Sequence, residues 1–467
     1  RVEDADWIEA LAALVTADAR PDAALPPGAT LTTLGNAWGV EDYFLGLRLL
    51  RRAAPIRYVA FLHDCVPLAM PEHCRDGIPE LYVRWFSALA LHADGLLTNS
   101  HATAADAVRF GAPLGLPPPA RVIPLAAEPP ETGPEAEAAA DALEALRPGE
   151  PFVLFVATIE SRKNHLLVLR AWLELIRRHG AVAIPRLVLV GRDGWRADAA
   201  LALLDRAPEL RAGVLRLSGV SDLALAGLTG RCLFTIYNSF HEGWGLPVSE
   251  SLAAGVPCVV PAHSALLESG APGGIFFPPG DLPALVASLE QLILDPAHRV
   301  ALASRIDRVA AARGWIQAAS DVLTTLAALP PATPPRRLPL DRPIPLGTGA
   351  GQASVATAWG EAVRVGRGWW SAETWGCWTR DGVASLALPA DAPHGSMLQV
   401  TLTLRGPPGG TAPRLRLRSA VDAPWRMIVL AGDADSQIHL LASACSEGLA
   451  LDIDCGDGTL LPGDRNK

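Results

Sequence analysis

Residues 238–250 read Asn-Ser-Phe-His-Glu-Gly-Trp-Gly-Leu-Pro-Val-Ser-Glu, which places Glu242 eight positions before Glu250 across a glycine-rich turn. The β-favouring run 234–237 precedes the turn, and Pro247 suits the first turn of a helix. The pattern predicts a strand, a turn and a short helix. Glycine lets a ligand approach the backbone closely, and the first N–H groups of a helix attract an anion. An anion site flanked by two carboxylates fits a phosphate-linked, hydroxyl-rich ligand such as a sugar nucleotide.

The length and charge of the chain limit the classes of protein to consider. Its 467 residues are enough for two or three domains, and half of them are hydrophobic, so sizeable cores can be buried. The net charge of −9 disfavours a general nucleic-acid-binding protein, which would usually be basic. No apolar run reaches the roughly 18 residues of a membrane span and no signal peptide is visible, so we expect a cytoplasmic protein.

The cysteines predict free thiols rather than a metal site or disulfides. They show no C-x2-C spacing and their number is odd, which fits unpaired thiols in a reducing compartment. The seven positions are Cys65, Cys74, Cys232, Cys258, Cys377, Cys445 and Cys455.

Strand and helix patterns alternate in the second region of the chain, which predicts a doubly wound parallel sheet there. The first region has expected strands at 30–34, 57–62 and 95–98 and helices at 41–53, 79–92 and 101–110. A Pro/Glu/Ala-rich stretch, 128–141, leads into the second region. There we expect strands at 152–157, 186–190, 214–218, 232–237 and 257–260, and helices at 164–179, 197–206, 221–229, 247–254, 281–294 and within 298–327.

The last part of the chain has a different periodicity. Residues 330–346 carry seven prolines in 17 positions, which is typical of an extended, semi-rigid linker. Apolar residues then recur with a period of two, which predicts an all-β sandwich. These segments are 398–404, 414–418, 425–430 and 449–453. The predicted domains are 1–145, 146–329, the linker 330–349 and the sandwich 350–467.

A second charged segment follows the expected strand 152–157. Residues 157–164 read Ala-Thr-Ile-Glu-Ser-Arg-Lys-Asn. Ligands bind at the carboxyl ends of strands in open α/β sheets. Arg162, as a bidentate fork, and Lys163, as a compact charge, would there meet a diphosphate and stabilise the charge on a departing phosphate. The alternative is that adjacent basic residues in a loop are simply solvated.

His63 and Asp64 end an apolar run and would orient a sugar or accept a proton, although a structural histidine is the alternative. Glu268 would contact either substrate or solvent. Asn99-Ser100-His101 fits the N-cap of a helix. Four tryptophans would either stack on sugar rings or pack in the core of the sandwich. They are Trp369, Trp370, Trp375 and Trp378.

These motifs resemble the retaining glycosyltransferases of family 4, the "group 1" set with the GT-B fold. The E-x7-E pattern of that family matches at Glu242 and Glu250, and 158–164 resembles its phosphate-gripping loop. Segments 61–67 and 97–103 resemble the N-terminal domain of members that build polysaccharides. The resemblance covers roughly residues 28–325. It implies two Rossmann-like α/β domains, with the C-terminal β-sandwich as an addition.

The resemblance also implies roles for individual residues. Glu242 would lie beside the donor sugar, Glu250 would hold the ribose, and Arg162 and Lys163 would bind the diphosphate. His63 or Asp64 would face the donor sugar and the acceptor. The turn and its backbone N–H groups would complete the substrate site. These residues are Gly243, Trp244, Gly245, Leu246, Pro247 and Val248.

Two departures from the family pattern are visible. Members often carry a basic residue where Thr158 stands, which leaves more of the diphosphate binding to Arg162 and Lys163. The family also begins with a strand and a glycine-rich loop that closes over the donor, and residues 1–30 show no such loop. Gly35 and Gly39 are the available stand-ins. We therefore expect an N-terminal domain that is truncated or degenerate.

The leading hypothesis is a metal-independent, retaining hexosyltransferase without a cofactor beyond its GDP- or UDP-linked donor. The resemblance favours GDP-mannose as donor and a polysaccharide or lipid-linked oligosaccharide as acceptor. A lipid-linked acceptor would require peripheral docking at the inner membrane, for which no basic amphipathic helix is evident. A non-catalytic carbohydrate-binding or scaffold protein with a glycosyltransferase-like remnant is the alternative. A GT-B sugar-nucleotide epimerase is a third hypothesis.

Overall fold

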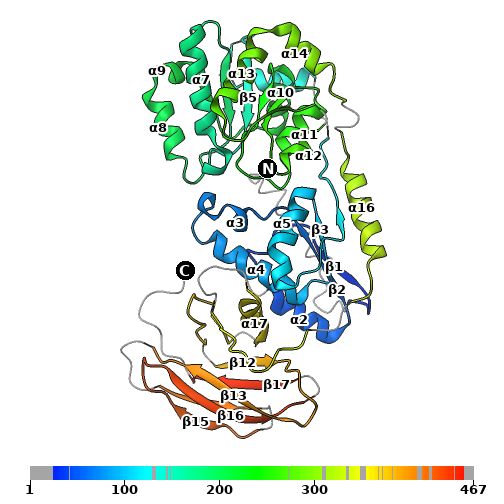
Figure 1. Ribbon diagram of the computed structural model, residues 1–467, viewed down its shortest axis with the longest axis vertical. Helices are drawn as coiled ribbons and strands as arrows, with labels where there is room; N and C mark the ends of the chain where they lie inside the picture. The colour runs from blue at the N-terminus through cyan, green and yellow to red at the C-terminus, as the bar shows by residue number, and fades with distance from the viewer. Residues whose placement is uncertain are drawn as a thin grey trace.

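The computed structural model has three parts (Figure 1). Two of them are parallel sheets with their helices, and the third is an antiparallel β unit. The helix-covered sheet of residues 150–300 lies at one end, the N-terminal sheet lies in the middle, and the β unit lies at the other end. Residues 25–456 are described apart from 41–42, 129–132, 144–145, 148, 272, 308–311, 333–335, 348–353, 366–367, 371, 381, 408–412, 420–422 and 446–447.

The first sheet is parallel, with its strands in chain order. Its strands are β1 (Thr30–Thr33), β2 (Arg57–Leu62), β3 (Gly95–Thr98) and β4 (Arg121–Val122). The helices around it are α2 (Tyr43–Ala53), α3 (Val66–Ala69), the short η1 (Pro71–His73), α4 (Ile78–His92) and α5 (His101–Gly111). Gly35 and Gly39 lie in the loop after β1. The prediction of a truncated or degenerate N-terminal domain concerned residues 1–30, of which 1–24 lie outside the described residues.

The second sheet has six parallel strands in the order β10-β9-β8-β5-β6-β7. They are β5 (Phe152–Val156), β6 (Arg186–Val190), β7 (Val214–Leu217), β8 (Thr235–Ile236), β9 (Cys258–Pro261) and β10 (Ile275–Phe277). Its helices are α7 (His165–His179), α8 (Asp198–Arg206), α9 (Pro208–Gly213), α10 (Asp222–Arg231), α11 (Leu246–Ala253), α12 (Leu266–Ser269), α13 (Leu282–Leu294) and α14 (Pro296–Ala303). The order reverses at β5 and β8, which makes their carboxyl ends the place for a ligand.

Two helices connect the sheets. The stretch 128–141 contains α6 (Pro134–Asp141), which packs on α10 so closely that a Cβ on Gly227 would lie 2.1 Å from the Ala136 carbonyl oxygen. Helix α16 (Trp315–Ala328) returns the chain to the first sheet (Figure 1). There Val322 and Leu326 join the buried face formed by Phe61 and its neighbours.

The C-terminal unit has two antiparallel sheets, as the period of two predicts. One has the order β11-β12-β17-β14-β15 and the other pairs β13 with β16. Helix α17 also belongs to this part of the chain, so the prediction of an all-β unit is only partly correct. The elements are α17 (Val355–Val363), β11 (Arg364–Val365), β12 (Val383–Leu388), β13 (Met397–Leu404), β14 (Arg414–Arg418), β15 (Arg426–Val429), β16 (Ser436–Ser443) and β17 (Leu449–Asp454).

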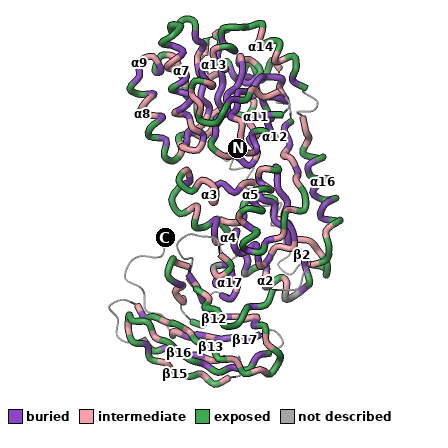
Figure 2. The backbone as a smooth tube through the Cα atoms, in the orientation of Figure 1, coloured by how far each residue is buried: buried purple, intermediate pink, exposed green. Residues whose placement is uncertain are grey.

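Burial follows the expected layering in the two parallel sheets, because their central strands are buried and the outer faces of the helices are exposed (Figure 2). Five of the six residues of β2 are buried, as are the first four of β5. All seven cysteines are unpaired. In the part of the chain that the structure describes, no helix has the length and apolar character needed to cross a membrane.

Candidate active site

The candidate site lies where two loops meet at the carboxyl end of the second sheet. Strands β5 and β8 are parallel neighbours, so loop 157–164 and turn 238–245 leave the same edge. Backbone contacts join these loops. The Phe240 N–H donates to the Arg162 carbonyl oxygen at 2.9 Å, and the Ser239 hydroxyl donates to the same oxygen at 3.2 Å.

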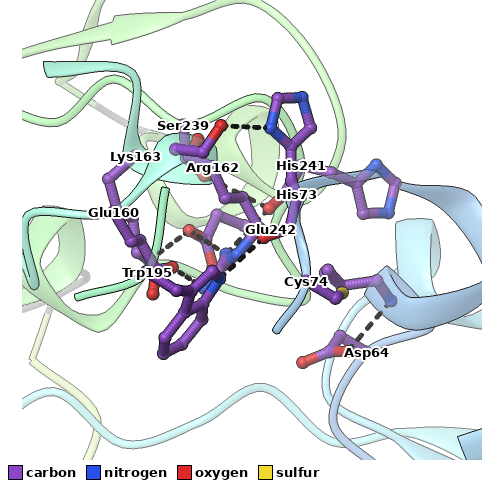
Figure 3. A network of polar contacts seen from close by, with 12 residues as sticks. Asp64, His73, Cys74, Glu160, Arg162, Lys163, Trp195, Ser239, His241 and Glu242 are labelled. Atoms are coloured by element: carbon purple, nitrogen blue, oxygen red, sulfur yellow. Dashed lines mark hydrogen bonds and ion pairs between the residues drawn. The ribbon is translucent and has the colours of Figure 1, made fainter. Parts of the chain in front are cut away.

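Glu242 lies at the centre of a buried charge cluster (Figure 3). Its Oε1 accepts hydrogen bonds from Arg162 Nη1 at 2.7 Å and from Lys163 Nζ. Tyr237 OH donates to the same oxygen at 3.1 Å and accepts from Lys163 at 2.5 Å. Arg162 also forms an ion pair with Glu160 at 3.0 Å. Lys163 and Glu242 are each only 9% exposed, so two cations and two carboxylates share a largely water-free space.

The cationic neighbours keep Glu242 ionised. Burial opposes its charged form, but Lys163 and Arg162 outweigh burial and lower the pKa of Glu242 below its ordinary value. Glu160 differs, because burial raises its pKa. The two cations are therefore already fixed in place where other negative oxygens could replace the Glu242 carboxylate.

The first domain forms the opposite wall of the site through the segment after β2. The His63 carbonyl oxygen accepts from Asn99 Nδ2 at 2.8 Å, and Thr103 Oγ1 donates to the Gly243 carbonyl oxygen at 3.3 Å. A Cβ placed on Gly243 would lie 1.7 Å from the His63 carbonyl oxygen and 2.8 Å from Asp64 Cβ. The turn that carries Glu242 thus packs directly on the loop that carries His63 and Asp64.

His63 and Asp64 have different surroundings. His63 Nε2 donates to the Leu34 carbonyl oxygen at 2.7 Å, so its ring contacts the loop after β1. Asp64 accepts from the Val66 N–H at 3.0 Å. Burial raises the pKa of Asp64, and the charges of Arg162 and Glu242 also act on it. Of the two predicted residues, the structure thus brings Asp64 into the electrostatic field of the cluster.

The turn residues shape the start of α11. Gly245 has a φ of 102°, which favours glycine, and its place beside Leu266 leaves only 2.8 Å to an added Cβ. Trp244 Nε1 donates to Ser249 Oγ at 2.9 Å. Helix α11 begins at Leu246, Pro247 has no N–H, and the Val248 N–H donates to the Gly245 carbonyl oxygen at 3.0 Å. Gly245 and Leu246 therefore remain the candidate backbone donors to an anion.

Glu250 lies apart from the Glu242 cluster and lines a cavity. Its side chain lines a cavity of about 400 Å³ together with Glu128, Asp222 and Pro247. Burial and the nearby Asp222 raise the pKa of Glu250 above its ordinary value. The cavity is bounded by β8 and α10, at the same edge of the sheet as the Glu242 cluster. Glu242 thus belongs to the charge cluster, whereas Glu250 lines the cavity.

Thr158 lies in the loop after β5, where its carbonyl oxygen accepts from the Glu160 N–H at 2.9 Å. Its methyl group faces Gly194, at which an added Cβ would lie 2.8 Å away. The position therefore packs against a neighbouring loop. Among the described residues, no group of three His, Cys, Asp or Glu side chains is arranged to hold a metal ion.

Sequence reasoning missed the residues that join the two domains beside the cluster (Figure 3). His73, at the end of η1, is hydrogen-bonded through Nδ1 to Ser161 Oγ at 2.7 Å and stacks on Phe240 with ring centroids 4.6 Å apart. Trp195 Nε1 donates to the His73 carbonyl oxygen at 2.8 Å. Tyr237 was visible only as the last residue of a β-favouring run. Contacts across the domains leave no local pattern. Of these residues, only Ser161 and Phe240 lay within motifs already singled out.

Glu268, for which substrate and solvent were the alternatives, is half-buried and contacts the N-terminus of α5. Its two carboxylate oxygens accept from the His101 and Ala102 N–H groups, each at 2.8 Å. Ser100 Oγ accepts from the Thr103 N–H at 2.9 Å, so the predicted cap of α5 is confirmed. Glu268 of the second domain therefore completes the cap of a helix in the first domain.

We expect the Glu268→Ala substitution to lower the free energy of unfolding by about 1 kcal/mol, as loss of a helix cap does. The thermal midpoint of the purified chain measures this change. Glu268→Gln is the matched control, because it keeps one acceptor oxygen and should lose less. An alanine variant with an unchanged midpoint would show that this contact does not stabilise the closed pair of domains.

The part of the chain that contains the Glu242 cluster is similar to known glycosyltransferases. Residues 139–309 match the family described as Glycosyl transferases group 1. The chain contains a glycosyltransferase group 1 domain. This domain includes Arg162, Lys163, Glu242 and Glu250. The serotype-specific mannosyltransferase WbdA of Escherichia coli is 32% identical over 219 residues, which is 45% of this chain and 26% of WbdA. O-antigen chain mannosyltransferase B of Escherichia coli is 33% identical over 168 residues, 36% of this chain and 41% of that protein.

Solved structures extend the likeness beyond the group 1 domain. Sucrose-phosphate synthase from Thermosynechococcus elongatus has a TM-score of 0.52 at 22% identity and covers 69% of this chain and 77% of its own. Anabaena HepE in complex with UDP has a TM-score of 0.50 at 18% identity and covers 64% of this chain and 79% of its own. The two parallel sheets thus have a GT-B-like glycosyltransferase fold. The match to WbdA spans only about a quarter of that protein.

Proposed function

We propose that the chain is a retaining hexosyltransferase that transfers mannose from a GDP- or UDP-linked donor to a polysaccharide or lipid-linked oligosaccharide. The observation that carries this proposal is the buried cluster in which Arg162 and Lys163 hold Glu242, on a turn whose Gly243 packs on the other domain. The mannosyltransferase relatives support the choice of sugar and of a polysaccharide acceptor. The complete set of Glu242, Glu250, Arg162 and Lys163 disfavours a non-catalytic scaffold. The enzyme would work in the cytoplasm, at the membrane surface for a lipid-linked acceptor.

The nucleoside, the diphosphate and the sugar of the donor would each bind to a different part of the site. The nucleoside would occupy the cavity of about 400 Å³, where Glu250 would accept hydrogen bonds from the ribose hydroxyls. The diphosphate would take the place of Glu242 on Arg162 and Lys163, assisted by the N–H groups of Gly245 and Leu246. The released Glu242 carboxylate would then accept hydrogen bonds from the hydroxyls of the donor sugar. The pair of cations would be poised before the donor arrives.

Every bond and proton of the proposed reaction is accounted for by the donor and the acceptor alone. The acceptor hydroxyl oxygen would bond to the anomeric carbon on the face from which the diphosphate departs, and the carbon–oxygen bond to the diphosphate would break. The hydroxyl proton would pass to the departing phosphate oxygen. Arg162 and Lys163 would stabilise the negative charge that grows on that phosphate, which is the task a metal ion performs elsewhere. Asp64, on the opposite wall, would orient the acceptor.

Thermal-shift measurements with a panel of GDP- and UDP-sugars test the donor site. A ligand at about 100 times its dissociation constant adds roughly 2.7 kcal/mol to the free energy of unfolding. Stabilisation by one base with one sugar would identify the donor, and GDP-mannose is the expected one. A panel without any stabilising member would contradict the proposal.

Glu250→Ala should weaken binding of the responsive sugar nucleotide about tenfold or more, because hydrogen bonds to a charged group are lost. Titration calorimetry of the variant against the parent chain measures the change. Glu174→Ala is the matched control, since Glu174 lies on α7 and pairs with Arg178. Equal affinities of the parent chain, Glu250→Ala and Glu174→Ala would show that Glu250 does not bind the nucleotide.

A further inference from the structure

The C-terminal unit encloses a large cavity between its two sheets. Its volume is about 1440 Å³, which exceeds the 300–1,000 Å³ usual for sites of single small ligands. The inward side chains of β13, among them Val400 and Leu402, line it and are only partly buried. The sheets of this sandwich therefore do not close on each other over the whole of their length, as those of a filled core would.

Two tryptophans form an aromatic corner in the lining of this cavity. Trp375 is 49% exposed, so it lies where the cavity opens to solvent. Trp378 meets it edge to face, with ring centroids 4.9 Å apart. Trp375 Nε1 donates to Glu373 Oε2 at 2.8 Å, which fixes the orientation of the exposed ring. Trp378 Nε1 is buried and has no hydrogen-bond partner within the described residues, so this ring contributes packing beneath Trp375 and not a polar contact.

Charged planar groups stand beside the aromatic corner. The Arg405 guanidinium lies 5.8 Å from the centre of the Trp375 ring. Arg405 is held by Asp435 through bonds of 2.7 and 2.8 Å, and both residues line the cavity. The other two tryptophans of the cluster are already engaged. Trp369 belongs to the core, and the Arg380 guanidinium lies 4.5 Å from the centre of the Trp370 ring.

We propose that this cavity is a binding site for an oligosaccharide, separate from the donor site. The apolar C–H face of a sugar ring would stack on Trp375, and its hydroxyls would bond to Arg405 and Asp435. An exposed, oriented aromatic ring next to paired charged groups offers both kinds of contact that a sugar presents. The size of the cavity admits several sugar rings, which selects a glycan segment over a monosaccharide.

The cavity-bearing unit is attached to the first domain. Helix α17 packs along α4, and Glu361 of α17 forms an ion pair with Arg84 at 3.5 Å. Arg48 of α2 donates to the Arg364 carbonyl oxygen at 2.9 Å (Figure 1 shows α17 beside α4 and α2). A glycan held by the unit would thus be carried by the domain opposite the donor site. A role for this glycan as the growing acceptor rests on the proposed function, whereas its binding does not.

Binding of neutral oligosaccharides to the full chain tests the site directly. We expect dissociation constants from an array of manno-, gluco-, galacto- and rhamno-oligosaccharides to identify at least one ligand, with affinity rising with the number of sugar units. Trp375→Ala should weaken that binding about tenfold or more, as truncation of a central aromatic anchor does. Trp425→Ala is the matched control. Its ring faces Arg416 and Arg418 in the same unit and does not line the cavity, so binding should be unchanged.

A Lys163→Ala background separates this proposal from the proposed transfer reaction. Oligosaccharide binding should persist there even when no sugar is transferred, and the loss caused by Trp375→Ala should be of the same size. No binding by any oligosaccharide of the array would overturn the proposal, as would equal losses in the Trp375 and Trp425 variants. Binding of a polyprenyl phosphate in place of every oligosaccharide would also overturn it and make the cavity a lipid site.

Discussion

Lys163→Ala should lower kcat for sugar transfer by about 100- to 1,000-fold, the usual cost of removing one group that stabilises charge in the transition state. Lys163 Nζ contacts both Glu242 and Tyr237, so in the parent chain its ammonium is fixed before any donor binds. Arg162 still pairs with Glu242 in the variant, which limits the structural damage. The rate of nucleotide release with and without acceptor measures the effect.

A matched double variant separates catalysis from stability. Lys163→Ala leaves the buried Glu242 with less positive charge around it, which costs stability. Lys163→Ala combined with Glu242→Gln removes the charge from both partners, so the thermal midpoint should recover while kcat stays at least as low as in Lys163→Ala. Recovery of transfer together with the midpoint, or a Lys163→Ala variant within threefold of the parent kcat, would refute the leaving-group role.

Local patterns predict the elements around the site closely, because the signals lie in neighbouring residues. The run 57–62 is a strand with those bounds, and Ser100 caps its helix as its position indicates. In the β unit, 414–418 is likewise a strand as predicted. Strand β12 (Val383–Leu388) escaped prediction because the small Ala384 and Ala387 blur its alternation. Strand β8 is shorter than the run 232–237 that predicts it.

Contacts between distant segments account for what the sequence could not predict. The Glu268 carboxylate finds its partners at His101 and Ala102, in another domain. The structure places the tryptophans of the cluster in two different environments. Trp369 packs in the core, as the duller alternative held, whereas Trp375 is half exposed. A spacing along the chain cannot distinguish these two environments, since it contains no information about which sheet covers which ring.

Gly243→Ala should reduce transfer by about 100-fold or more, because a misplacement of about 1 Å within a reacting assembly has an effect of that size. The added Cβ would lie 1.7 Å from the His63 carbonyl oxygen, and that oxygen belongs to the backbone, so no side-chain rotation relieves the clash. The two domains would have to separate at the point where the Glu242 turn meets the His63–Asp64 loop. Asp64 would then move away from the cluster, although each domain keeps its own core.

The same substitution should leave binding of the donor nearly intact, which distinguishes a defect in closure from loss of the donor site. The cationic pair and all the residues that line the nucleotide cavity except Glu128 lie in the second domain, so the dissociation constant for the responsive sugar nucleotide should change less than threefold while kcat falls. Gly46→Ala is the matched control, because an added Cβ there meets nothing within 4 Å and the position is an exposed one in α2. Small-angle scattering should show a larger radius of gyration for Gly243→Ala only. A Gly243→Ala variant that transfers sugar at the parent rate would mean that the domains work without the contact between Gly243 and His63.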